Sequence, residues 1–78
     1  MHSEPEFQKI RDIISQVLGT AQEEIGENTG LTAELYADSM EIFQILAEAE
    51  KEFDMKFSPD RMEEIRTAGD ILRLLEES

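Results

Sequence analysis

Ser39 is the residue of this chain whose type and position best suit a chemical role. Asp38, directly before it, is a good helix cap because its carboxylate can accept hydrogen bonds from the free N–H groups of a first helical turn. Glu41 can in turn accept a bond from the Asp38 N–H. Ser39 would then be the first residue of the helix, with its hydroxyl at the positive end of the helix dipole, where an anionic group is stabilised. The alternative is that Asp38-Ser39 is ordinary capping chemistry with no further role.

Other side chains with catalytic or metal-binding chemistry are scarce. The chain has no cysteine, which excludes a disulfide framework, a thiolate metal site and a cysteine nucleophile. Its only histidine is His2, which we expect to be solvated near the terminus rather than part of a Ser-His-acid triad. The acidic residues are expected to form solvated faces, and residues 27–30, the nearest approach to a calcium loop, lack the required spacing. We therefore expect neither a metal site nor catalysis by this chain alone.

The charge balance bounds the possible partners. The chain carries 19 Asp or Glu and 7 Lys or Arg residues, for a formal net charge of −12. Such a charge repels nucleic acid and anionic membrane, whose binding relies on Lys and Arg contacts with phosphate. It attracts basic protein surfaces, although acidity can also serve solubility alone. No secretory or membrane-length apolar run occurs, so we expect a cytoplasmic protein without membrane insertion.

The chain length and the first apolar pattern indicate one small helical domain. At 78 residues, residues 1–78 are expected to share one modest core. Residues 1–5 are expected to be disordered, and a helix is expected from Glu6 to Leu18, with Gly19 ending it. The stripe that this helix should bury comprises Phe7, Ile10, Ile14, Val17 and Leu18, with Ile13 beside it.

Residues 19–37 form a long connection for so small a domain. Residues 21–25 can make a short helical turn within it. Leu31 and Leu35 are four residues apart and are expected to anchor the connection onto the core. A loop of this length is usually functional or held by its own side chains.

The strongest helix prediction covers residues 39–53, which have a cap, strong helix formers and no Gly or Pro. Its apolar residues are so numerous that we expect it to be central to a bundle. Met40, Phe43, Leu46, Ala47 and Phe53 fall on one broad apolar face, which Ile42, Ile45 and Ala49 widen.

The last third of the chain contains two further helix starts. Phe57 is expected to point inward, and Ser58-Pro59-Asp60 combines a serine cap with proline at the first helical position. This short helix should end near Ile65. Thr67 should cap a final helix, with Asp70 completing a variant capping box. The expected inward residues of the last two helices are Met62, Ile65, Ile71, Leu72, Leu74 and Leu75. The predicted fold class is all-α, a four-helix bundle with a long loop between helices one and two.

In register with this helix order, the chain resembles the acyl carrier protein family. The resemblance rests on Leu35-x-Ala37-Asp38-Ser39-Met40-Glu41, where the family typically has Leu-Gly-Ala-Asp-Ser-Leu followed by Asp or Glu. It continues through Glu50-x-Glu52-Phe53-Asp54, Pro59-Asp60 and Ile65-x-Thr67, and so covers nearly the full chain.

The resemblance implies a covalent cofactor on Ser39. That cofactor is 4′-phosphopantetheine, transferred from coenzyme A by a separate phosphopantetheinyl transferase. Its thiol would carry acyl groups as thioesters for fatty-acid or related lipid or polyketide biosynthesis. The chain would then be a carrier that partner enzymes act on, and the imported thiol would be its only reactive sulfur.

The resemblance also implies how partners and acyl groups are held. Acyl-transferring and synthase enzymes would dock a monomeric carrier through basic patches. The implied contact residues are Asp38, Met40, Glu41, Glu48 and Glu50. The acyl chain would lie between helices, and the residues expected to line that space are Leu46, Met62, Ile65 and Ile71, for which ordinary core packing is the alternative.

Departures from the family pattern concern the pathway rather than the carrier role. Tyr36 stands where glycine is usual and could alter the loop or stack near the arm. Gln44 and Lys51 stand where fatty-acid carriers often have acids. A carrier dedicated to a specialised lipid or secondary-metabolite route is therefore an alternative to the fatty-acid carrier. The alternative of a different class is an unmodified acidic helical module that binds basic protein surfaces.

Overall fold

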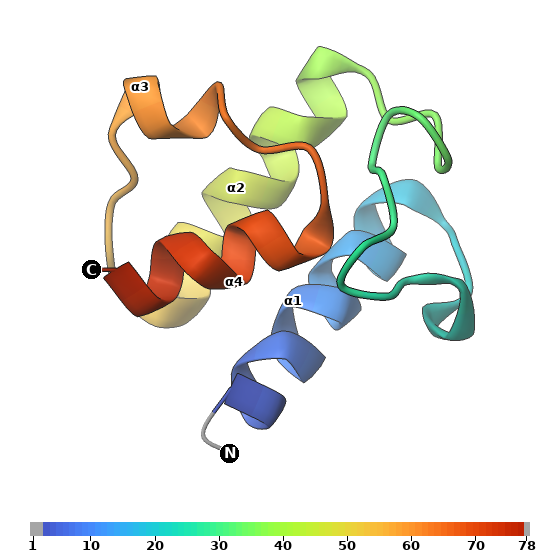
Figure 1. Ribbon diagram of the computed structural model, residues 1–78, viewed down its shortest axis with the longest axis horizontal. Coiled ribbons are helices and arrows are strands. Elements are labelled where there is room, and N and C mark those ends of the chain that lie inside the picture. The colour runs from blue at the N-terminus through green and yellow to red at the C-terminus, as the bar shows by residue number, and fades with distance from the viewer. Residues whose placement is uncertain (1–2, 78) are drawn as a thin grey trace.

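The computed structural model describes residues 3–77 as a helical bundle (Figure 1). Its elements are α1 (Ser3–Leu18), the 3-10 helix η1 (Gln22–Glu24), α2 (Ser39–Phe53), α3 (Pro59–Met62) and α4 (Ala68–Glu77). No strand forms within residues 3–77, where the β-type pairing is an isolated bridge between Gly30 and Thr67. The predicted all-α fold class is confirmed. His2 lies outside the described residues.

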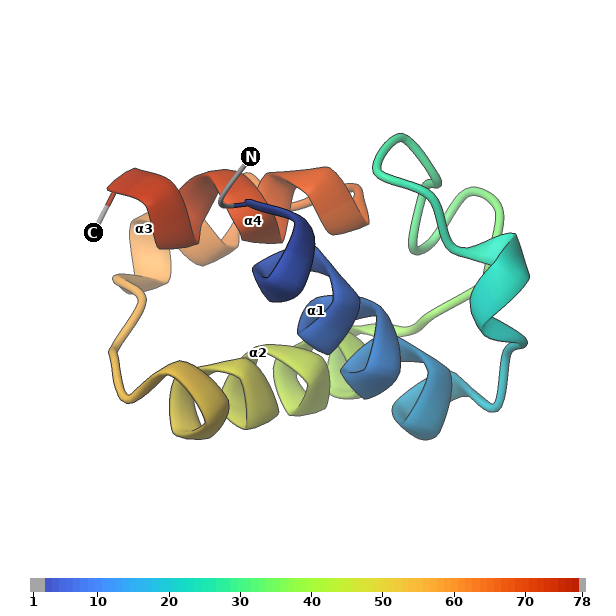
Figure 2. The same cartoon turned by 90° about the horizontal axis from the view of Figure 1, so that it is seen from below.

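Helix α1 packs against both α2 and α4. Figure 2 shows α2 and α4 on opposite sides of the bundle, with α1 crossing between them. The long loop lies at one end of the molecule and α3 at the other (Figure 1). The start of α2 follows directly from the long loop, so this loop determines how Ser39 is presented.

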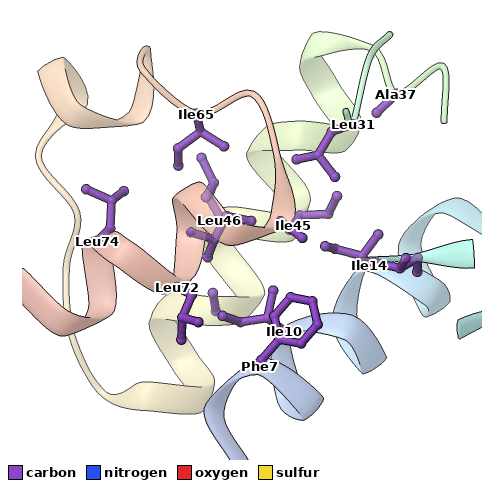
Figure 3. Close-up of a cluster of buried hydrophobic side chains, with 14 of the residues drawn as sticks. Phe7, Ile10, Ile14, Leu31, Ala37, Ile45, Leu46, Ile65, Leu72 and Leu74 are labelled. Carbon is purple, nitrogen blue, oxygen red and sulfur yellow. The ribbon is translucent and has the colours of Figure 1, made fainter. Parts of the chain in front are cut away.

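The core is formed by side chains from α1, α2 and α4, together with the loops (Figure 3). Ile10, Ile14, Leu31, Ile45, Leu46 and Ile71 are among the fully buried side chains. The other buried apolar residues are Phe7, Ile25, Ala37, Ala49, Phe57, Ile65, Ala68, Leu72 and Leu74. The stripe predicted on α1 and the inward positions of Phe57 and Ile65 are confirmed.

Helix ends follow the local signals closely. Gly19 adopts a left-handed φ of 70° and its N–H donates to Ser15 O at 2.8 Å, which ends α1 as predicted. Helix α1 begins at Ser3, three residues before the expected Glu6. The Ser58 hydroxyl accepts from the Arg61 N–H and Pro59 is the first residue of α3. That helix ends at Met62 rather than near Ile65, because its single turn gives way to hydrogen-bonded turns.

The long loop is tied to the start of α4. Leu31 is fully buried, and its N–H donates to Arg66 O at 2.8 Å. The Gly69 N–H donates to Glu27 O at 2.9 Å, and a Cβ at Gly69 would lie 2.7 Å from that same oxygen. Glycine is therefore required at position 69 for the loop to approach this closely. The short turn expected at residues 21–25 is present as η1.

The single broad apolar face predicted on α2 is only partly buried, and the exposure of Met40 agrees with its predicted role as a partner contact. Met40 and Phe43 are 77% and 58% exposed, and Ala47 is exposed as well. Ile45, Leu46 and Ala49, which belong to the same predicted face, are buried. At about 100° per residue the centres of these two sets lie roughly 150° apart around the helix, with Leu46 nearest to the exposed set. Helix α2 therefore has two apolar stripes, of which only one faces the core.

Candidate functional site

Ser39 is exposed and is the first residue of α2. Asp38 precedes it as the N-cap, and its Oδ1 accepts from the Glu41 N–H at 2.8 Å. The Glu41 Oε1 accepts from the Asp38 N–H at 3.0 Å, which completes the predicted capping box. The first N–H groups of a helix have no intrahelical partners and carry partial positive charge. The hydroxyl therefore lies in solvent at the end of α2 that stabilises an anion.

The chain before the cap is held in a fixed conformation. Ala37 is 2% exposed, and its N–H donates to Leu31 O at 2.9 Å. The Thr32 hydroxyl donates to Ala37 O at 3.0 Å, and the Tyr36 N–H donates to Thr32 O at 3.2 Å. Tyr36 has a φ of 63°, the left-handed conformation that favours glycine. The backbone at position 36 therefore has a conformation that glycine adopts at the lowest steric cost.

A cavity of about 350 Å³ opens beside Ser39, between α2 and the segment from α3 to Ile65. Its lining is mainly apolar and consists of Ser39, Ile42, Phe43, Leu46, Pro59, Met62, Glu63 and Ile65. Leu46 and Ile65 are labelled in Figure 3. Three of the four residues expected to line an acyl site, Leu46, Met62 and Ile65, border this cavity. Ile71 does not border it and is fully buried in the core.

The acidic residues singled out on α2 have unequal surroundings. Glu48 is exposed and forms only a 3.7 Å ion pair with the exposed Lys51. Glu41 belongs to the capping box, and the Glu50 Oε2 accepts from the Phe57 N–H at 2.8 Å. Glu50 therefore holds the connector after α2 in place. Glu48 is the acid whose substitution disturbs the fold least.

Neither a membrane-spanning helix nor a metal-binding cluster occurs within residues 3–77. No helix in this range is long and apolar enough to cross a membrane. No group of three or more His, Asp or Glu side chains in the described part of the chain is arranged to hold a metal ion.

Fold and site together define a class of protein, a small helical carrier domain that presents a serine at a helix start. Comparison with known families supports this class, because the profile described as "Phosphopantetheine attachment site" matches residues 8–75. The acyl carrier protein of Streptococcus thermophilus is 38% identical over 71 residues, which cover 91% of this chain and 92% of that protein. The acyl carrier protein of Thermotoga maritima is 34% identical over 70 residues, covering 90% and 86%.

A solved structure agrees with the sequence matches. A candidate acyl carrier protein from Mycobacterium tuberculosis superimposes with a TM-score of 0.85 at 31% identity, covering 91% of this chain and 95% of that one. The chain belongs to the acyl carrier protein family. It is a carrier of acyl groups rather than an enzyme, and it bears a covalently attached 4′-phosphopantetheine. Its family interacts with phosphopantetheinyl transferases and with synthase or acyltransferase enzymes.

The site fits this prosthetic group. The attachment chemistry needs an accessible hydroxyl, and the Ser39 side chain is exposed at a helix start whose dipole favours a phosphodiester. The acyl group needs an apolar shelter, and the cavity that Ser39 borders is mainly apolar. When bound, the group supplies the thiol that this cysteine-free chain lacks.

Sequence reasoning missed two features of this site. The first is the exposure of Phe43, since apolar periodicity on α2 is satisfied by either of two stripes. The second is the left-handed backbone at Tyr36. A signal for the second was available, because Tyr36 stands where the family usually has glycine.

Proposed function

We propose that Ser39 is the residue to which 4′-phosphopantetheine is attached. The observation that carries the proposal is the position of this serine, exposed as the first residue of α2 and directly after the N-cap Asp38 of a complete capping box. The phosphodiester would lie at the positive end of the helix, an effect worth about 0.3–1 kcal/mol at an exposed site.

Ser39 supplies only its oxygen to the attachment reaction. The Ser39 Oγ loses its proton and forms a bond to the phosphorus that carries the pantetheine. The bond from that phosphorus to the neighbouring phosphate breaks, and the adenosine bisphosphate half of coenzyme A leaves. The adjacent Asp38 and Glu41 carboxylates are engaged in the capping box. We therefore assign the base that accepts the proton to the transferase.

The cavity beside Ser39 is proposed to shelter the acyl group. Leu46, Met62 and Ile65 would contact it, and burial of each methylene is worth about 0.8 kcal/mol. Ile71 would act from behind the lining, as a core residue. The same cavity suits acyl groups of fatty-acid synthesis and of related lipid or polyketide routes. Mass analysis of the acyl group on the thiol in cells distinguishes these pathways.

Partner enzymes are proposed to dock a monomeric carrier at the start and outer face of α2 through basic patches. Asp38, Met40 and Glu48 are exposed there and are the proposed direct contacts. Glu41 and Glu50 would contribute charge while they also stabilise the fold. A net charge of −12 favours rapid encounter with basic surfaces. The cytoplasmic location stays a prediction.

Intact-mass measurement tests the attachment residue. The chain, incubated with coenzyme A and a phosphopantetheinyl transferase, should gain one phosphopantetheine, and Ser39→Ala should gain none. Ser58→Ala is a matched control, because Ser58 is another exposed serine at a helix start. Normal modification of Ser58→Ala together with normal helicity of Ser39→Ala makes the result specific. Modification of Ser39→Ala would contradict the proposal, and no gain by the unaltered chain would favour the unmodified adaptor.

A further inference from the structure

The large apolar side chains that residues 3–77 leave exposed are all close to Ser39. They are Tyr36, Met40 and Phe43, at 83%, 77% and 58% exposure. Each lies within four residues of Ser39 along the chain. We call these three residues the apolar patch. Phe43 is one helical turn after Ser39 and borders the same cavity. The patch therefore lies next to Ser39, the proposed attachment residue.

Tyr36 holds its exposed position against a conformational cost. A left-handed φ disfavours a residue with a Cβ by roughly 1–2 kcal/mol. With its side chain 83% exposed, Tyr36 buries too little surface within this chain to offset that cost. A glycine at position 36 would avoid the cost altogether. The folded chain alone gives no reason for tyrosine here.

The surrounding backbone imposes this conformation and so fixes the direction in which the side chain leaves the loop. The N–H groups of Tyr36 and Ala37 both donate to the preceding turn, to Thr32 O and Leu31 O. Leu31 and Ala37 are buried on either side of the strained residue. Because the backbone is already fixed, binding has to order only the two side-chain torsions of Tyr36, which is a small entropic cost for so large a contact area.

The charge around the patch identifies its occupant. Glu34, Asp38 and Glu48 are exposed on the loop and on α2. A second copy of this chain would bring another charge of −12 to the same surface, which disfavours self-association. A partner enzyme with a small apolar hollow surrounded by Lys and Arg satisfies both the apolar and the acidic parts of this surface.

We propose that Tyr36 is a docking residue whose ring enters such a hollow on partner enzymes, with Met40 and Phe43 completing the contact. This proposal rests on Ser39 being the attachment residue, because that places the partner's active site beside the patch. It also gives a reason for a tyrosine at a position where the left-handed backbone favours glycine.

The test measures direct binding and transfer with one partner, a purified phosphopantetheinyl transferase. Titration calorimetry gives the Kd of the unmodified chain, and steady-state transfer from coenzyme A gives kcat and KM. Tyr36→Asn keeps a residue that tolerates left-handed φ but removes the ring. We expect it to raise both Kd and KM by about 5- to 30-fold with little change in kcat, the effect of losing one interface anchor. Tyr36→Phe should stay within about twofold.

Two controls separate docking from folding. Tyr36→Gly should weaken binding as Tyr36→Asn does, while raising Tm by about 4 °C through relief of strain. Asp54→Gly is the matched control, since Asp54 also has a left-handed φ, of 53°, at the opposite end of α2. It should leave Kd and KM unchanged.

Two outcomes would overturn the proposal. If Tyr36→Asn and Tyr36→Gly alter Tm but leave Kd and KM at the values of the unaltered chain, Tyr36 is only structural. If sedimentation shows a dimer of the unaltered chain that Tyr36→Asn disrupts, the occupant is a second copy. Failure of the attachment proposal would look different, since it is read from the mass of Ser39→Ala and not from the Kd of Tyr36 variants.

Discussion

The starts of α2 and α4 are capped by the same local chemistry, but the first is exposed and the second is covered. At α2, Asp38 and Glu41 form a capping box. At α4, the Thr67 hydroxyl accepts from the Asp70 N–H at 3.2 Å, and Asp70 Oδ2 accepts from the Thr67 N–H at 3.1 Å. Each start thus satisfies free N–H groups through a side chain three residues away.

The two helix starts differ in whether other segments of the chain cover them. The start of α4 is closed by the long loop, through the Gly30–Thr67 bridge and the bond from Gly69 N–H to Glu27 O. Ala68, the first residue of α4, is fully buried. Ser39, the first residue of α2, is exposed. A capping sequence therefore specifies where a helix begins, whereas contacts from distant segments decide whether that beginning is available to a partner.

The largest change in the free energy of unfolding is expected at Leu31, the buried residue that joins the loop to the start of α4. We expect Leu31→Ala to lower the free energy of unfolding by about 2–5 kcal/mol, because it leaves a cavity at a fully buried position. Met40→Ala at the exposed start should change it by less than about 0.5 kcal/mol. Urea unfolding followed by circular dichroism measures both. Equal losses would mean that the start of α2 is as integral to the core as the start of α4.

Gly69→Ala should have the next largest effect. The added methyl group would lie 2.7 Å from Glu27 O, so the loop must move away from α4. We expect a loss of about 1–3 kcal/mol from this overpacking, although alanine is the better helix former. Gly26→Ala is the matched control, because its Cβ would meet Thr29 Oγ1 at an ordinary 3.5 Å. Thermal unfolding that finds Gly69→Ala as stable as Gly26→Ala would show that the loop can shift freely.

The sequence was sufficient for the helix caps and for the stop at Gly19 but not for the contacts between segments. Asp38, Gly19 and Ser58 each act through neighbours within a few residues, so their roles could be predicted. The close approach of Gly69 to Glu27 joins residues 42 positions apart, and no local pattern signals it. The same limit applies to Phe43, whose exposure depends on which stripe of α2 meets α1 and α4.

The candidate site likewise has some features set by neighbouring residues and others set by the placement of distant segments. The cap and the position of Ser39 as the first helical residue could be predicted from residues 38–41 alone, whereas the exposure of Ser39 depends on where the distant segments lie. Ile71 was expected beside Leu46 and Met62, yet it is buried in the core rather than at the cavity. Apolar character on a helix predicts burial, and only the relative placement of α2, α3 and α4 decides which buried residue borders a cavity.

Asp70 should show a smaller effect that depends on pH. Partial burial raises the pKa of its carboxyl, but hydrogen bonds from the Arg66 and Thr67 N–H groups, with the charge of Arg73, lower it below the ordinary 3.8. Because the pKa is depressed in the folded state, the contribution to stability is complete above pH 3.8 and is lost as pH falls through the lower folded value.

We expect Asp70→Asn to cost about 1 kcal/mol at pH 7. The difference from the unaltered chain should shrink below about pH 4, where the carboxylate protonates. Asp38→Asn at the exposed start should cost only a few tenths of a kcal/mol (about 0.3), since asparagine is as good an N-cap as aspartate. Urea unfolding at a series of pH values measures both. A gap for Asp70→Asn that persists undiminished at pH 2 would contradict the assigned role of the charge.

The smallest effect on stability, and the sharpest separation of docking from folding, is expected at Glu48. Glu48→Lys removes only an exposed 3.7 Å pair with Lys51, worth less than about 0.5 kcal/mol. Glu23→Lys makes the same change in net charge in η1, on the long loop. If partners dock along α2, Glu48→Lys should raise the KM of phosphopantetheine transfer by about 3- to 10-fold at low salt, and Glu23→Lys should not. Because salt screens exposed charges, the difference should narrow in about 0.5 M salt. Equal effects of the two variants would mean that net charge attracts the partner and that the outer face of α2 has no special part in docking.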